Sequence, residues 1–183
     1  MYGAGSVLAV QYDEYGGPSV LSLRRITPPS PRAGEVLVEV HAVSVNPVDW
    51  KVRSGMLQKF FPITFPATTG RDGAGKVIGA ASATDEHLVG ERVCFLAPRD
   101  VGTWSERIAL PASMAVPIPP SVPYEQAASL PLAGIAAMVG IVQTAKVDSG
   151  MRVLIHAAGG GVGSLAVQIA RANGATVVAT CSG

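Results

Sequence analysis

The stretch from Arg152 to Thr180 constrains the fold of this chain more than any other. Residues 153–155 and 177–179 are short apolar runs that fit buried parallel strands. Between them, the glycine cluster 159–163 leads into apolar residues at helical spacing, and Asn173-Gly174 is a typical helix end. Strand, glycine turn, helix and strand in this order predict a βαβ unit with a right-handed crossover.

The glycine cluster points to a ligand. Without Cβ atoms the backbone can approach a pyrophosphate closely, and the free N–H groups at a helix start hold its negative charge. An alternative is a glycine-rich turn that only lets helix and strand pack closely. The predicted cofactor-binding residues of this turn are Ala157, Gly160, Gly161, Val162 and Gly163.

The end of the second strand bears on the choice of cofactor. An acidic residue there would accept hydrogen bonds from the adenosine ribose and favour NAD. This chain has the small, uncharged residues Thr180, Cys181, Ser182 and Gly183. The prediction is therefore NADPH, with Ser182 near the additional phosphate.

Composition excludes several classes of protein. Of 183 residues, 48% are hydrophobic and 15% charged, which is typical of a globular chain with a substantial core. A net charge of +1 without a basic cluster argues against a nucleic-acid partner. Two cysteines cannot form a disulfide framework, and the N-terminus lacks the pattern of a signal peptide, so we expect a cytoplasmic protein.

One uncharged segment is nearly as long as a membrane span. Residues 127–145 carry no charged side chain, and the length of this segment approaches that of a transmembrane helix. However, Pro131 and Gly134 interrupt its start, and no basic flank or aromatic belt accompanies it. We therefore predict that this segment forms a buried helix and that the protein has no membrane contact.

The region before this segment has the pattern of a small β domain. Short strands are predicted at 7–10, 20–26, 35–40 and 74–78, and again near 90–95 and 103–110. The five prolines of residues 111–123 mark a change to helical, alanine-rich sequence. We therefore expect a β domain over 1–120 and, over 121–183, the start of a doubly wound α/β domain that stops just past its second strand.

A compact helix is predicted inside the β domain. Asn46 suits the N-cap, Pro47 the first helical position, Asp49 the third position and Gly55 the exit. Residues 60–69 are expected to form a proline-broken apolar loop, and residues 70–73 a turn.

Several motifs occur together in a characteristic order: SVNPVDWKVRSG, FPATTGRDGAGKV, GERV, AASLPLAG and HAAGGGVGSLAVQIA. With them the chain resembles the medium-chain dehydrogenase/reductase superfamily, and within it the zinc-independent quinone oxidoreductases and their alkenal (enone) reductase relatives. The resemblance covers essentially the whole chain. It implies a GroES-like catalytic domain in 1–120, an incomplete Rossmann domain in 121–183, and an active site in the cleft between them.

The resemblance also implies a function: reduction of quinones or α,β-unsaturated carbonyls by NADPH, by a full-length protein that is a homodimer. Zinc enzymes of this fold have a cysteine ligand near Asn46–Asp49 and a histidine at Arg71-Asp72. This chain has neither, and its cysteines and histidines lack the close spacing of a zinc site, so no metal is expected.

Two catalytic candidates follow, each with a structural alternative. By resemblance Asn46 faces the nicotinamide and carbonyl end of the cleft; it also suits the N-cap, and both roles can hold. Lys51 could donate to the oxygen that gains negative charge as hydride arrives, or it could be a solvated surface lysine. Asp49 is interpreted as a capping-box partner, and Arg71 and Asp72 as a turn with an ion pair.

The remaining positions are interpreted more briefly. Trp50, Phe60, Phe61 and Phe65 could line an apolar substrate cleft or only pack the domain. Ala136 stands where relatives often have a threonine that touches the cofactor, which puts that contact in doubt. Two further functions stay open: a non-catalytic fragment or nucleotide-binding domain, and an enoyl reductase module of a larger synthase.

Overall fold

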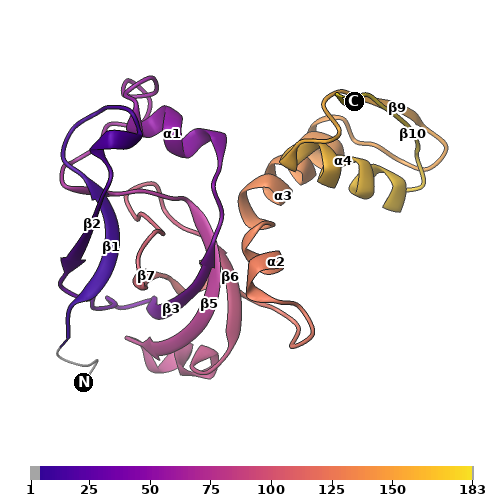
Figure 1. The fold of residues 1–183 in the computed structure, drawn as a ribbon. Coiled ribbons are helices and arrows are strands. Elements are labelled where there is room, and N and C mark those ends of the chain that lie inside the picture. The colour runs from indigo at the N-terminus through magenta and orange to yellow at the C-terminus, as the bar shows by residue number, and fades with distance from the viewer. Residues whose placement is uncertain (1–4, 183) are drawn as a thin grey trace. The chain divides into compact units, whose positions relative to one another are not determined.

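The structure is a computed structural model that describes residues 5–182. The chain forms two compact units, residues 1–129 and 130–183 (Figure 1). Each unit has a hydrophobic core of its own.

The first unit is built on a five-stranded antiparallel sheet with strand order β7-β3-β5-β6-β8. The strands are β3 (Glu35–Val43), β5 (Asp72–Ala80), β6 (Arg92–Leu96), β7 (Arg107–Pro111) and β8 (Ala115–Pro117). A second sheet has the order β2-β1-β4, from β1 (Val7–Tyr12), β2 (Ser22–Ile26) and β4 (Ala67–Thr68). A bridge between Ala9 and Ser105 joins the second sheet to the segment before β7.

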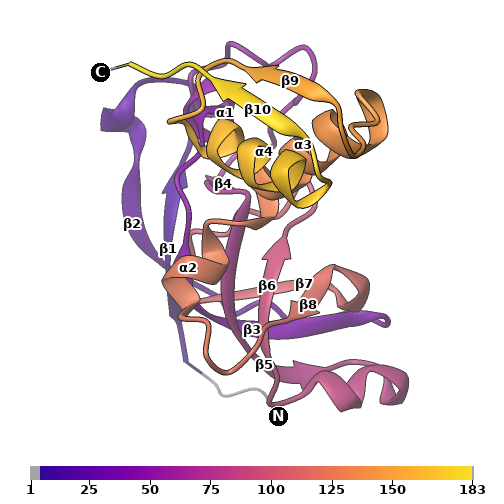
Figure 2. The same cartoon turned by 90° about the vertical axis from the view of Figure 1, so that its right-hand side faces the viewer.

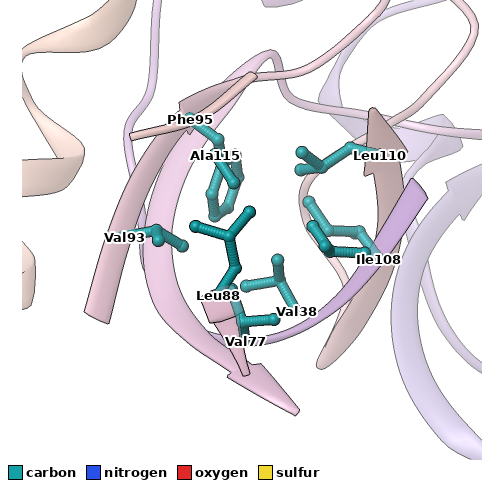
Figure 3. Close-up of a cluster of buried hydrophobic side chains, with 9 residues drawn as sticks. Val38, Val77, Leu88, Val93, Phe95, Ile108, Leu110 and Ala115 are labelled. Atoms are coloured by element: carbon teal, nitrogen blue, oxygen red, sulfur yellow. The ribbon is translucent and has the colours of Figure 1, made fainter. Parts of the chain in front are cut away.

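Apolar side chains of the larger sheet gather in one hydrophobic core, and β3 is buried on both faces at Val36, Leu37 and Val38. Val36, Val38, Val77, Val93 and Leu110 are completely buried there. Phe95 and Ile108 lie among the same side chains in Figure 3. The predicted β domain is confirmed.

Short helices complete this unit: α1 (Pro47–Arg53), α2 (Tyr124–Ala128) and 3₁₀ helices at Pro18–Val20, Ala83–Leu88 and Ala112–Met114. Helix α2 packs on β5, where Ala127 and Ala128 bury against Ala74. Because of this packing the first compact unit extends past residue 120 to Ser129.

The second unit contains α3 (Pro131–Met138), a π-helical turn (Val139–Thr144), β9 (Arg152–Ile155), α4 (Gly161–Ala172) and β10 (Thr176–Ala179). Strands β9 and β10 are parallel, with Thr176 opposite Arg152 and Ala179 opposite Ile155. Helix α4 lies against both strands, as Figure 2 shows. The predicted βαβ unit is therefore confirmed, including the helix end, where Asn173 caps α4 and Gly174 has φ +82°.

Two local predictions are wrong. Residues 127–145 form parts of three helical pieces and not one buried helix, and Ile135, Met138 and Val139 are 41–49% exposed within the chain. The turn predicted at 70–73 ends earlier, because Asp72 and Gly73 already pair with Leu96 and Phe95 as the start of β5. In the described part of the chain, no helix is long and apolar enough to cross a membrane.

Candidate functional site

Asn46 begins helix α1 as the sequence predicts. Its backbone is extended, with φ −115° and ψ 152°, and Pro47 takes the first helical position. The backbone N–H of Asn46 donates to Asp49 Oδ2 at 2.7 Å, and the Asp49 N–H donates to the Asn46 carbonyl oxygen at 3.0 Å. The Asp49 carboxylate thus supplies the reciprocal half of a capping box, and the two bonds satisfy donors that a helix start leaves open.

The side chain of Asn46 joins a polar network that the sequence did not reveal. Its Nδ2 donates to Ser44 Oγ at 2.7 Å and to Asp72 Oδ1 at 2.9 Å. The Ser44 hydroxyl also donates to Asp72 Oδ1. Asp72 is completely buried at the start of β5, 26 residues from Asn46. Only the pairing of strands brings the three residues together.

Two residues before β7 hold the main chain of this network by hydrogen bonds. Thr103 Oγ1 donates to the backbone oxygen of Asp72 at 3.1 Å, and Trp104 Nε1 donates to the backbone oxygen of Ser44 at 3.2 Å. Gly70 has φ +95°, and a Cβ there would lie 2.2 Å from Trp104 Cδ1. Glycine at this position therefore permits the indole to reach Ser44.

Asp49 is the electrostatically unusual group of the site. It is 5% exposed, and among the described residues its Oδ1 is buried without a hydrogen-bond partner. Burial raises the pKa of Asp49 to about 6, while the bond from the Asn46 N–H opposes the shift and Asp72 adds to it. Burial also lowers the pKa of Arg71. The Arg71 guanidinium donates to the carbonyl oxygens of Pro98 and Ala97 at 2.8 and 3.0 Å.

A cavity of about 390 Å³ adjoins Asp49 in the first unit. Its size is in the range of small-molecule sites. Apolar and charged side chains share its wall, among them Asp49, Val52, Ile63, Arg71, Val101 and Ile108.

The four aromatic residues predicted as possible substrate contacts do not line this cavity. Trp50 and Phe60 are 44% and 74% exposed. Phe61 packs its ring on the Arg99 guanidinium at 4.5 Å, and Phe65 meets two tyrosine rings edge-on. Phe61 and Phe65 therefore pack the domain, and Trp50 and Phe60 lie at its surface.

Lys51 lies on α1 but outside the Asn46 network. Its Nζ is 5.6 Å from the centre of the Trp50 ring. Within residues 5–182 no carboxylate lies at ion-pair distance from this ammonium group. The charge is thus available to a ligand or to solvent. In the same described range, no group of three or more His, Cys, Asp or Glu side chains could hold a metal ion.

The glycine turn of the second unit has the geometry that close backbone approach requires. Ala157 adopts φ +55°, and its carbonyl oxygen accepts the Gly160 N–H at 3.0 Å. A Cβ on Gly163 would lie 2.3 Å from the same oxygen and 2.8 Å from Ala158 Cα. Gly163 is therefore required for α4 to pack onto the turn.

The start of α4 leaves donors free for an anion. Ser164 N–H donates to the Gly160 carbonyl oxygen at 2.9 Å. In the described chain no protein acceptor takes the N–H groups of Gly161, Val162 and Gly163. Unpaired N–H groups at a helix N-terminus are an anion-binding arrangement. Such an arrangement can hold a phosphate group.

The end of β10 lies beside this turn. Thr180 Oγ1 and His156 Nδ1 are 3.0 Å apart, so His156 holds the strand end. A Cβ on Gly159 would be 3.6 Å from Cys181 Cβ, which places the turn against the residues after the strand. Ser182 is exposed, and Gly183 lies outside the described residues.

Comparison with known proteins agrees with this architecture. Residues 32–120 match the model of the alcohol dehydrogenase GroES-like domain. The chain is 36% identical to a chloroplastic quinone-oxidoreductase homolog of Spinacia oleracea over 180 residues, which is 94% of this chain and 55% of that protein.

Solved structures are similar over the same range. The CurK enoyl reductase is 35% identical with a TM-score of 0.88, over 96% of this chain and 54% of that one. Escherichia coli quinone oxidoreductase complexed with NADPH is 29% identical with a TM-score of 0.82, over 96% and 53%. The chain spans about half the length of the curated relatives it matches. It belongs to the medium-chain dehydrogenase/reductase superfamily, is quinone oxidoreductase-like, and corresponds to the N-terminal part of these relatives.

Proposed function

We propose that the protein is a zinc-independent, NADPH-dependent oxidoreductase that reduces quinones or α,β-unsaturated carbonyl compounds. The observation that carries this proposal is the glycine turn with free N–H groups at the start of α4, in a chain similar to quinone oxidoreductases. The similar Escherichia coli enzyme was crystallised with NADPH.

The cofactor would be held by the backbone of the turn. Ala157 and Gly160 shape it, and the N–H groups of Gly161, Val162 and Gly163 face the pyrophosphate. Ser182, uncharged and exposed, offers a hydroxyl to the 2′-phosphate and no carboxylate that would repel it. When bound, NADPH supplies the hydride.

Residues of the first unit act on the acceptor. A quinone or enone oxygen gains negative charge during reduction, and the Lys51 ammonium donates a hydrogen bond to it. A proton from solvent completes the hydroquinone or ketone product. Asn46 orients the reacting end of the site through its anchored amide.

The zinc-free part of the proposal rests on donor chemistry. Where zinc enzymes of this fold place ligands, this chain has Asn46, Asp49, Arg71 and Asp72. An arginine cannot bind a cation, and Asp72 accepts hydrogen bonds from Ser44 and Asn46.

The test is NADPH oxidation with a series of quinone and enone acceptors, with and without a chelator. We expect turnover that the chelator does not change. Tight NADPH binding without turnover of any acceptor would contradict the proposal.

Titration of the 183-residue chain with NADPH, followed by cofactor fluorescence, tests the alternative of a non-catalytic domain. This chain carries a two-stranded part of the sheet and spans about half of its relatives. We therefore expect it to bind NADPH weakly or not at all. Micromolar binding with hydride transfer would show that these residues suffice.

Lys51→Gln tests the role of the ammonium group. Loss of a donor to a developing oxyanion typically lowers kcat by about 10²–10³-fold. Lys59→Gln is the matched control, because Lys59 is an exposed lysine six residues past α1. Equal activity of the two variants would remove Lys51 from the mechanism.

A second candidate function is reduction of an enoyl thioester by a module of a larger synthase. The similarity to the CurK enoyl reductase favours it. A crotonyl thioester and a simple quinone offered under the same conditions separate the two, since the preferred acceptor has the higher kcat/KM.

The assembly and location of the protein are also proposals. We propose a homodimer, which light scattering would detect. We expect a cytoplasmic location, although the spinach relative is named chloroplastic, and imaging of the tagged protein would decide between the two compartments.

A further inference from the structure

Asp72 is the acidic residue at the centre of the Asn46 network. It is fully buried, and its Oδ1 accepts hydrogen bonds from the Ser44 hydroxyl and from Asn46 Nδ2. An ionised carboxylate can only accept hydrogen bonds. The nitrogen end of the Asn46 amide must therefore face Asp72, because the opposite orientation would set the carbonyl oxygen against a carboxylate oxygen.

Ser44 closes the arrangement from a third side. Its hydroxyl donates to Asp72 Oδ1, so its oxygen is left to accept from Asn46 Nδ2 at 2.7 Å. The three side chains form a closed triangle in which each proton has one consistent direction. Ser44 follows β3 and Asp72 begins β5, so the triangle is anchored to paired strands.

From this geometry we infer that Asp72 is a positioning residue for Asn46 in the reaction. This inference rests on the proposed function, in which Asn46 is a site residue. The main chain of Asn46 is held by Asp49, while Ser44 and Asp72 bind its amide. Asp72 can only accept, so it determines which end of the amide faces the network. The last torsion of an asparagine side chain is broad and two-fold, and the Ser44 hydroxyl alone can either donate or accept, so without Asp72 both amide orientations become populated.

Asn46→Asp is the informative substitution, because aspartate is as good an N-cap as asparagine. A residue that only caps α1 would tolerate this change at every pH. Next to Asp72, however, the new carboxylate would stand about 2.9 Å from an existing one. Two carboxylates at this distance cannot both ionise, and one has to take up a proton.

The variant N46D is therefore expected to lose stability at about pH 8 and to regain it toward about pH 5. The exchange variant N46D/D72N again pairs one amide with one carboxylate, so it should recover most of the stability and lose the pH dependence. The kinetic test is Asp72→Asn, which keeps the Asn46 amide and removes its carboxylate partner. Misplacement of a site group costs about 10²-fold in rate, and we expect a loss of this size in the kcat of Asp72→Asn.

Other titratable groups in this region are present in every variant. Asp49 and Arg53 belong to α1, Arg71 precedes β5, and the Cys94 thiol on β6 faces Asp72. These groups also contribute to the dependence of stability on pH in the wild type and in Asp72→Asn. A pH dependence found only in N46D therefore belongs to the two carboxylates at positions 46 and 72.

Two readouts keep the inference separate from the proposed function. Unfolding in urea, followed by the fluorescence of Trp50 and Trp104 in the first unit, measures the pH-dependent coupling without any turnover. Turnover with NADPH and a quinone measures the functional effect. A wild-type protein without turnover would contradict the proposed function, while the unfolding cycle would still test the pairing.

The inference is overturned if N46D is as stable at about pH 8 as the wild type. It is also overturned if the exchange variant is no more stable than N46D, or if stability follows the expected pattern while Asp72→Asn keeps the kcat of the wild type.

Discussion

Replacement of Gly163 by alanine should open helix α4, because the new Cβ would lie 2.3 Å from the carbonyl oxygen of Ala157 and 2.8 Å from Ala158 Cα. Both neighbours are backbone atoms, which cannot rotate away as a flexible side chain can. Overpacking of this kind costs about 1–3 kcal/mol. Alanine also gains up to about 1 kcal/mol of helix propensity over glycine, which hides part of the cost.

Gly161→Ala is the matched control for this effect. Its Cβ would have Ala133 Cβ as nearest neighbour at 3.8 Å, an ordinary contact. Both variants make the same exchange in the first turn of α4, so the propensity gain is largely shared. The difference between Gly163→Ala and Gly161→Ala therefore isolates the overlap with the turn.

Hydrogen exchange of the α4 amides is the suitable assay. Trp50 and Trp104 both belong to the first unit, so tryptophan fluorescence does not report on α4. A difference of about 1–3 kcal/mol corresponds to exchange about 5- to 150-fold faster in Gly163→Ala than in Gly161→Ala. Exchange rates within about twofold of each other would refute the packing argument.

Three further predictions concern the first unit and the cofactor. Gly70→Ala should lower the free energy of unfolding in urea by about 1–3 kcal/mol more than Gly90→Ala does. The two glycines have nearly the same φ, +95° and +93°, but only a Cβ on Gly70 would meet another atom, Trp104 Cδ1 at 2.2 Å. Since the folded pKa of Asp49 is raised from 3.8 to about 6, its unfolded carboxyl ionises first. Wild-type stability should then fall by up to about 3 kcal/mol as pH rises between these values, and Asp49→Asn should abolish this slope; an unchanged slope would contradict the assignment. Ser182→Glu should weaken NADPH binding relative to NADH in a fluorescence titration, and an unchanged ratio would place the 2′-phosphate elsewhere.

Much of the fold follows from patterns within a few residues. Alternation along residues 35–40 predicts β3, and the Asn46-Pro47 pair with Asp49 predicts the start of α1. The glycine turn between two apolar runs predicts β9, α4 and β10. Such features depend on local backbone preferences and on hydrogen bonds between near neighbours, which short sequence patterns record directly.

The partners of Arg71 and Asp72 could not be predicted from short sequence patterns. Their position next to each other predicts a turn with an ion pair. In the structure, Asp72 begins β5 and also binds Ser44 and Asn46, and Arg71 also binds carbonyl oxygens of residues 97 and 98. These partners are 26 to 28 residues distant, and only strand pairing determines which of them meet.

A β domain followed by a glycine-rich βαβ unit can be predicted from the amino-acid sequence, because hydrophobic period and turn chemistry are local properties. The way Asn46 is held, the difficulty of ionising Asp49 and the need for glycine at position 163 become visible only in the folded chain. Each of these depends on what distant segments place around a residue: a buried carboxylate, a wall that excludes water, or a carbonyl oxygen in contact. Burial and long-range contact exist only once the chain has folded.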